Sequence, residues 1–224
     1  MFLDDKVKNL VQMLSSLPKD LSPVLRQEEY ILQLTQQMEY LDQFGDDRRP
    51  PFYDEECTPV LRDIVAPFLS AFRVWKINHK EGKAHFHLLF KKIPLKDILL
   101  VMGQRQTSAS INDENGLPPL KDHLLVSFNE CHKHTLSVGA RAWCKHANRS
   151  ENSFWGDVKG NDAYKNKSAQ LILQRLLTEY TWWNVFEHYK HGVVYEVRVT
   201  SGHGARWAAN GKVFIGLLEP FVEA

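Results

Sequence analysis

Side chains suited to chemistry concentrate in two stretches of this sequence. The first covers residues 132–160, HKHTLSVGARAWCKHANRSENSFWGDVKG, and combines histidines with lysines, arginines, tryptophans and glycines. The second is the shorter SGHGARW at residues 201–207. Histidine transfers protons near neutral pH, and arginine and lysine bind anions. Both stretches are therefore candidates for binding a charged ligand or for moving a proton.

Basic residues in the first stretch recur every four positions. Arg141, Lys145 and Arg149 would form one cationic stripe on a helix. In the second stretch, the glycines on either side of His203 let backbone amides approach a ligand closely, and Arg206 follows. We predict a site for a phosphate- or carboxylate-bearing small molecule. The arginines and the lysine bind charge and the histidines orient the ligand or move protons; the predicted residues are Arg141, Lys145, His146, Arg149, His203 and Arg206.

A metal site is an alternative use of the histidines. His85 and His87 are two residues apart in a predicted strand, which directs both rings to one face, and His132 and His134 repeat that spacing. Four imidazoles on neighbouring strands could bind zinc, iron or copper. No carboxylate lies at a telling offset, so the same spacing also fits the polar face of a sheet. We predict no bound metal and no cofactor.

The sequence leaves catalysis open. His146 or His203 could act as a general base, and Cys144 lies near cations that would lower the pKa of a nucleophilic thiol. However, adjacent residues on a helix do not face each other, which separates Cys144 from its neighbours. The patterns GxSxG, HExxH and GxxxxGK[ST] are absent. The reaction, if any, stays unknown.

Two other functions compete with a small-ligand site. Residues 1–130 carry 16 Lys and Arg against 19 Asp and Glu, whereas residues 131–212 carry 12 against 6. A basic second half rich in tryptophan is typical of single-stranded nucleic-acid binders, but a pI of about 7.8 is low for that class. The acidic segment 39–56 and the polar loop 104–119 would suit a protein-interaction module without catalysis. We rank an anionic small molecule first among partners, then a protein, then nucleic acid.

The amino-acid composition limits the classes of protein to which this chain can belong. A chain of 224 residues with 43% hydrophobic and 25% charged residues can form a core without disulfides or metal. Three cysteines without CxxC spacing indicate neither a disulfide framework nor a zinc site. The N-terminus lacks a signal-peptide pattern, and no apolar run is long enough to span a membrane. We predict a location in the cytoplasm or nucleus and no membrane contact.

The N-terminal third has the spacing of helices. Val7, Leu10, Val11 and Leu14 share one helical face within residues 4–15. A longer helix is predicted to begin with Ser22 as its N-cap and to end at Gly45. A third is predicted to start at Thr58-Pro59, with a break or kink near Pro67.

The sequence pattern of the remaining two thirds of the chain predicts mainly strands, with helices between them. Residues 72–90 read as a hairpin, residues 122–128 as a buried strand, and residues 139–148 and 168–183 as helices. Residues 193–200 alternate as a strand, and Asn210-Gly211 is a hairpin turn. We predict a single α+β domain over residues 1–224, mainly helical in 1–71 and sheet-containing in 72–224. Its N-terminal helical segments would pack on a mixed or antiparallel sheet that ends in a C-terminal β-hairpin.

Overall fold

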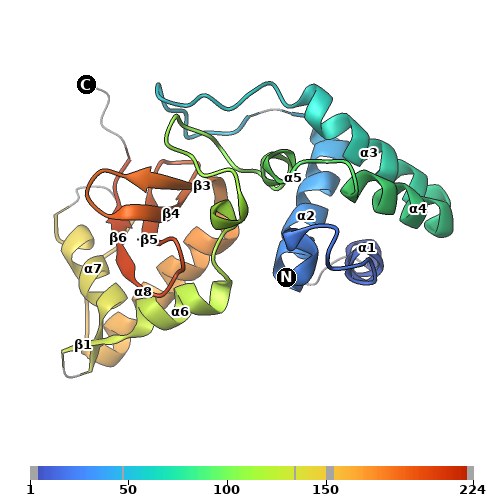
Figure 1. The fold of residues 1–224 in the computed structure, drawn as a ribbon. Coiled ribbons are helices and arrows are strands. Elements are labelled where there is room, and N and C mark those ends of the chain that lie inside the picture. The colour runs from blue at the N-terminus through green and yellow to red at the C-terminus, as the bar shows by residue number, and fades with distance from the viewer. Residues whose placement is uncertain (1–4, 47, 134, 150–153, 221–224) are drawn as a thin grey trace. The chain divides into compact units, whose positions relative to one another are not determined.

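The computed structural model describes residues 5–46, 48–133, 135–149 and 154–220. The chain forms two compact units (Figure 1). Unit 1 contains residues 1–48, 57–105 and 112–117, and unit 2 contains residues 49–56, 106–111 and 118–224. The prediction of a single domain stays a prediction. Each helix of the described residues is too short or too polar to cross a membrane.

Unit 1 is built from helices. They are α1 (Asp5–Ser15), the 3-10 turn η1 (Pro23–Arg26), α2 (Glu28–Phe44), α3 (Arg62–Ile77), α4 (His79–Phe90), α5 (Leu95–Val101) and the 3-10 turn η2 (Glu114–Gly116). Leu10 and Leu14 of α1 and Leu34 of α2 are buried at helical spacing, as predicted. Ser22 does cap a helix, because its hydroxyl accepts a hydrogen bond from the Val24 amide, but that helix is the short η1.

The hairpin predicted for residues 72–90 is wrong, because this stretch forms the end of α3 and all of α4. Trp75, Phe86 and Phe90 are buried along these helices, so helical spacing prevails over the short apparent alternation. The Asn78 side chain accepts hydrogen bonds from the first amides of α4 and separates the two helices. A Cβ on Gly82 would lie 2.3 Å from Trp75, so glycine permits their close packing. Of the break or kink predicted near Pro67, the break is wrong, since α3 continues through this residue.

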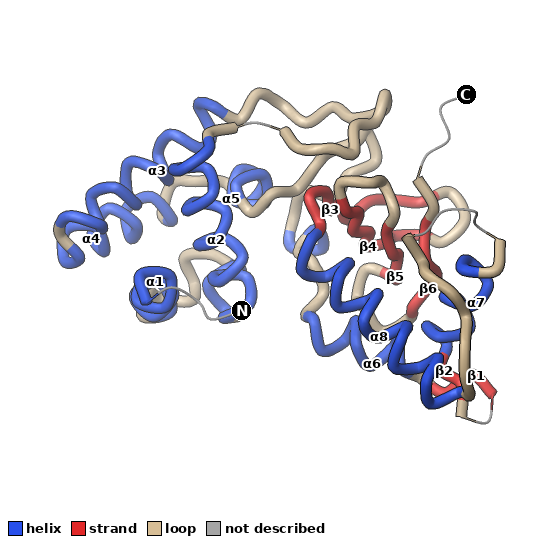
Figure 2. The backbone as a smooth tube through the Cα atoms, turned by 180° about the vertical axis from the view of Figure 1, so that it is seen from behind, coloured by secondary structure: helices blue, strands red, loops and turns tan. Residues whose placement is uncertain are grey.

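Unit 2 is a four-stranded antiparallel sheet packed against helices. The strands are β3 (Tyr180–His188), β4 (Gly192–Val199), β5 (Gly204–Ala208) and β6 (Phe214–Leu218), in the order β3-β4-β5-β6. The helices are α6 (Lys121–Asn129), α7 (Val138–Ala147) and α8 (Asp162–Glu179), and the short strands β1 (Cys131–Lys133) and β2 (Leu136–Ser137) form a separate ribbon. The helices lie together beside the sheet (Figure 2). The predicted α+β class, the antiparallel sheet and the C-terminal hairpin are confirmed.

The predictions for individual elements of unit 2 were correct for the turn with a strong local signal and wrong for two other elements. Gly211 has φ +72°, which suits the predicted Asn-Gly turn between β5 and β6. The strand predicted for residues 122–128 is wrong, because these residues form α6. The predicted helix 168–183 is instead α8, which ends at Glu179, so Trp182 and Trp183 belong to β3.

Two segments from the N-terminal half complete unit 2 at the outer edge of β3. Ile111 donates its amide hydrogen to the Val185 carbonyl at 2.9 Å, and the Glu187 amide donates to the Ala109 carbonyl at 3.0 Å. Tyr53 packs edge-on against Trp182, with ring centroids 5.4 Å apart. Residues 106–111 therefore pair with an edge strand that would otherwise be open, and Tyr53 from residues 49–56 covers Trp182 on that strand.

Candidate functional site

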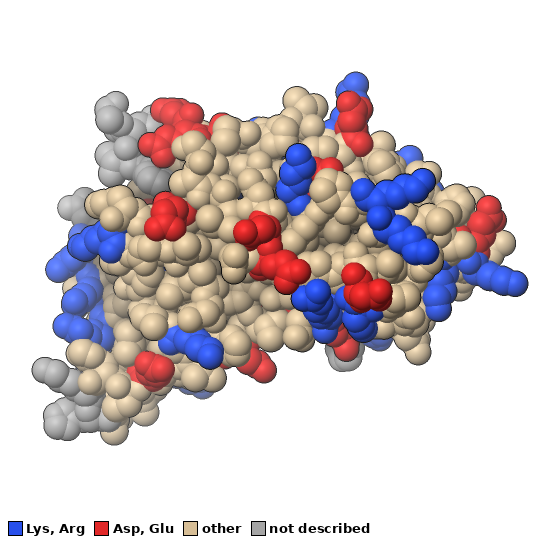
Figure 3. All heavy atoms as spheres, viewed as in Figure 1, with Lys and Arg blue, Asp and Glu red and all other residues tan. Residues whose placement is uncertain are grey.

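Helix α7 carries three of the six predicted site residues, namely Arg141, Lys145 and His146. The Ser137 hydroxyl caps it by accepting a hydrogen bond from the Ala140 amide at 3.0 Å. Arg141 and Lys145 are exposed on the helix, and Arg149 is exposed just after its end. Figure 3 shows Lys and Arg side chains gathered along the part of the surface where Figure 1 places α7.

His146, on the same helix, is only partly exposed and is held by a carboxylate. Its Nδ1 lies 2.6 Å from Oε1 of Glu219, just after β6. The Trp155 indole donates to the same oxygen at 2.8 Å. A carboxylate oxygen only accepts, so Nδ1 of His146 carries the proton of this contact, which leaves Nε2 for contact with a substrate. This arrangement has the form of a carboxylate-oriented proton-transfer histidine.

His203 meets His146 at this carboxylate. Its Nε2 lies 3.4 Å from Oε2 of Glu219, and its Nδ1 lies 2.9 Å from the Ser201 hydroxyl. The ring is buried and stacks on Phe154 with centroids 4.0 Å apart. Burial lowers the pKa of His203 below its usual value, so the imidazole is neutral at pH 7. A buried neutral ring suits a role in positioning Glu219 rather than contact with a large substrate.

Arg206 takes part in a separate group of contacts on the sheet. In β4 and β5, Glu196 and Arg206 lie directly opposite each other. Arg206 Nε and Nη2 contact Oε2 of Glu196 at 2.7 and 2.6 Å, and its Nη1 lies 2.8 Å from Nε2 of His188. The other carboxylate oxygen of Glu196 pairs with Arg198. Because its donors are engaged inside the protein, Arg206 is suited to support the site rather than to capture a ligand.

Arg198 joins the two groups of contacts. While its Nε pairs with Glu196, its Nη1 donates to the Gly202 carbonyl at 2.6 Å and to the Glu219 carbonyl at 2.9 Å. A continuous polar network therefore runs from His188 at the end of β3 to His146 on α7. Glu196 and Arg198 are almost completely buried, which makes this network part of the core of unit 2.

The sequence analysis missed four charged or histidine members of this network, namely Glu196, Arg198, Glu219 and His188. The alternation of β4 does place Glu196 and Arg198 on one face, which is a signal for these two. Glu219 is a lone acid near the C-terminus with no local signal. His188 was hidden because the strand that positions it was not predicted.

The described residues do not support the two alternative roles, which were metal binding by histidines and a nucleophilic thiol at Cys144. His85 and His87 lie on helix α4, where a spacing of two does not direct both rings to one face. His134 lies outside the described residues. Within the described ranges there is no cluster of His, Cys, Asp or Glu arranged to hold a metal ion. Burial raises the pKa of the Cys144 thiol, which disfavours the nucleophilic thiolate.

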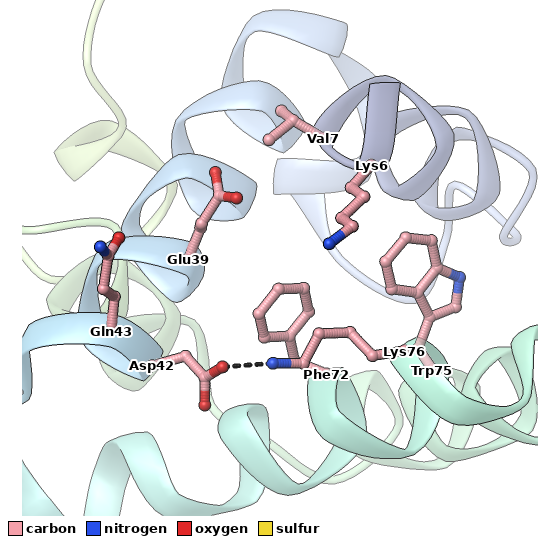
Figure 4. Close-up of a pocket in the computed structure, with 8 residues that line it drawn as sticks. All are labelled: Lys6, Val7, Glu39, Asp42, Gln43, Phe72, Trp75 and Lys76. Carbon is pink, nitrogen blue, oxygen red and sulfur yellow. Dashed lines mark hydrogen bonds and ion pairs between the residues drawn. The ribbon is translucent and has the colours of Figure 1, made fainter. Parts of the chain in front are cut away.

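Unit 1 contains a small cleft between α1, α2 and α3 (Figure 4). Asp42 faces Lys76 across it and also pairs with Arg73 at 2.7 Å, so these three side chains are engaged with one another. Its volume of about 180 Å³ is below the range typical of ligand pockets. We assign it no ligand.

Unit 2 is thus an α+β unit that holds two histidines against one carboxylate, beside a buried Glu–Arg network and a basic helix. Residues 126–219, which include most of this unit, match the family model of the CdiA C-terminal tRNase toxin domain. The match covers less than half of the 224 residues. No curated protein and no solved structure matches the chain.

The family match corrects the predicted function. A site for a phosphate- or carboxylate-bearing small molecule is contradicted, because the matching domain is a nuclease toxin that acts on tRNA. The ranking of partners, with an anionic small molecule first and nucleic acid last, is wrong for the same reason. The basic charge of residues 131–212 does not distinguish a small anion from a polyanion, which explains the error.

Proposed function

We propose that this protein is a ribonuclease that cleaves tRNA, with its chemistry in unit 2. The match of residues 126–219 to a tRNase toxin domain carries the proposal. It is supported by the position of His146 and its Glu219 partner within that same stretch. With tRNA as substrate, the predicted place of action becomes the cytoplasm.

His146 is the group that we assign to proton transfer. Its Nε2 takes the proton of the ribose 2′-hydroxyl, whose oxygen then attacks the adjacent phosphorus while the bond to the 5′ oxygen breaks. In an in-line displacement the 5′ oxygen leaves on the side of the phosphorus opposite the 2′ oxygen, so water protonates the leaving 5′ oxygen and the imidazolium returns its proton to the solvent. Glu219 holds Nδ1–H at 2.6 Å and stabilises the positive ring. The products are a 2′,3′-cyclic phosphate and a 5′-hydroxyl.

The other predicted site residues divide into two roles. Arg141, Lys145 and Arg149 are exposed and bind the phosphate backbone of the RNA. His203 positions Glu219 through the carboxylate, and Arg206 does so through Glu196 and Arg198.

Cleavage of purified tRNA by the full chain tests the proposal. We expect His146→Ala to reduce the cleavage rate about 10²–10⁴-fold, the range for loss of a general acid–base group. His123→Ala removes an exposed histidine of the same unit, on α6, and is the matched control. A DNA analogue should stay intact, because it lacks the 2′-hydroxyl. A folded chain that leaves tRNA uncut overturns the proposed function, and full activity in His146→Ala overturns the assigned role.

A separate measurement, of tRNA binding at different salt concentrations, tests the basic stripe at α7. Replacing Arg141, Lys145 and Arg149 together by alanine should weaken tRNA binding and make it less dependent on salt. Three lost phosphate contacts should reduce the slope of log K against log salt by about 2–3. An unchanged slope would mean that the RNA binds elsewhere.

A further inference from the structure

The turn between β3 and β4 presents an unusual group of rings at the surface. β3 ends at His188 and β4 begins at Gly192, and these two residues are paired. The side chain of Tyr189, in the turn, is 95% exposed. The His188 ring stacks on Tyr189 with centroids 4.7 Å apart and on His191 with centroids 4.9 Å apart. The interplanar angles are 27° and 29°.

The His188 ring, in the middle of this stack, is held by a contact with Arg206. Arg206 Nη1 lies 2.8 Å from Nε2 of His188, and Arg206 is itself held by two contacts to the buried Glu196. A guanidinium only donates, so Nε2 accepts and the imidazole is neutral. Desolvation, and then the charge of Arg206, lower the pKa of His188, which keeps the ring neutral at pH 7. The stack is therefore held in place before any ligand binds.

An exposed tyrosine that stacks on the His188 ring offers an aromatic face to a flat ligand. Nucleic-acid bases stack on such faces with little sequence preference, and a neighbouring cation contacts the phosphate. Lys190, exposed in the same turn, supplies that cation. A base inside a duplex has both faces covered by its neighbours, so only an unpaired nucleotide can stack here.

We propose that Tyr189, His188 and His191 form a stacking platform for an unpaired nucleotide of the RNA substrate. The platform rests on the proposed function, because it gives the ribonuclease a preference for loops and single-stranded ends over paired stems. It lies at the opposite end of the polar network from His146, so it acts in binding rather than in the chemical step.

Binding measured by fluorescence anisotropy separates stacking from charge. The proteins are full-length chains with His146→Ala, which prevents cleavage, and the probes are a labelled single-stranded 12-nucleotide RNA and a blunt duplex of the same length. We expect Tyr189→Ala to weaken binding of the single strand about tenfold, within the range for losing one base stack, and to leave duplex binding unchanged. Tyr189→Phe keeps the aromatic face and should keep the affinity. Tyr164→Ala, which removes a half-exposed tyrosine from α8, is the matched control.

The outcomes separate the platform from the proposed activity. Unchanged single-strand affinity in Tyr189→Ala, or an equal loss for both RNAs, overturns the platform. Cleavage of tRNA by the unaltered chain is scored separately, so the activity can stand when the platform fails. Conversely, selective loss of single-strand binding supports the platform even if the unaltered chain cuts no tRNA. A chain that binds neither RNA overturns the platform, and the proposed activity is then decided by the cleavage of tRNA alone.

Discussion

Removal of the Glu196 carboxylate is the strongest test of the polar network in unit 2. Glu196 is 2% exposed and pairs with Arg198, which is 3% exposed, and with Arg206. In Glu196→Ala both guanidinium groups lose their counter-charge, and Arg198 has no route to water. Breaking a buried ion pair from one side costs about 3–5 kcal/mol. At 2–4 °C per kcal/mol for a protein of this size, we expect a fall in melting temperature of roughly 6–20 °C.

Thermal unfolding followed by circular dichroism measures this fall. Glu187→Ala makes the same change of charge at an exposed position of the same sheet and should shift the melting temperature by no more than about 1–2 °C. Glu196→Gln keeps an acceptor for the arginines but not the charge, so its loss should be intermediate. A loss below about 1 kcal/mol in Glu196→Ala would refute the reasoning, because the two arginines would then be stable without a buried partner.

Two further predictions concern the core and its response to pH. Leu176→Ala removes a fully buried side chain of α8 and should cost about 2–5 kcal/mol, whereas Leu171→Ala, at an exposed position of the same helix, should cost far less; urea titrations compare them. Because burial lowers the pKa of His203, the unfolded chain binds more protons below about pH 6.5. Stability should fall as the pH drops from 7.5 to 5.5, and less steeply in His203→Gln; equal pH dependence in both chains would contradict this.

The correctly predicted elements are those with strong local signals. Helix α1 has four buried residues at helical spacing, and the Asn210-Gly211 turn needs a backbone conformation that few other pairs adopt. In contrast, the start of strand β3, residues 180–183, was predicted as the end of a helix, because Trp182 and Trp183 fit either structure. Pairing with β4 decides between them, and pairing is not visible in a local pattern.

The site residues, too, could be predicted only where the signal is local in the sequence. His146 and His203 were predicted from their chemical neighbours in sequence, and the structure does bring them to one carboxylate. That carboxylate, Glu219, comes from a segment 73 residues beyond His146, so only the fold reveals it. Arg206 was grouped with the same ligand by its sequence proximity to His203. The strand alternation instead directs it to Glu196 on the neighbouring strand.

The boundary of the family match also has a physical consequence. The matching stretch starts at residue 126, inside helix α6, whereas unit 2 includes segments 49–56 and 106–111. Residues 106–111 pair with the edge of β3 and Tyr53 packs on Trp182, so the matched residues alone would expose an unpaired strand edge and a large apolar side chain. The sheet that positions His188 and Arg206 therefore depends on residues that lie outside the stretch similar to the tRNase domain. Because the covering segments alternate in sequence with the helices of unit 1, no continuous stretch of the chain contains all of unit 2 without residues 57–105 of unit 1.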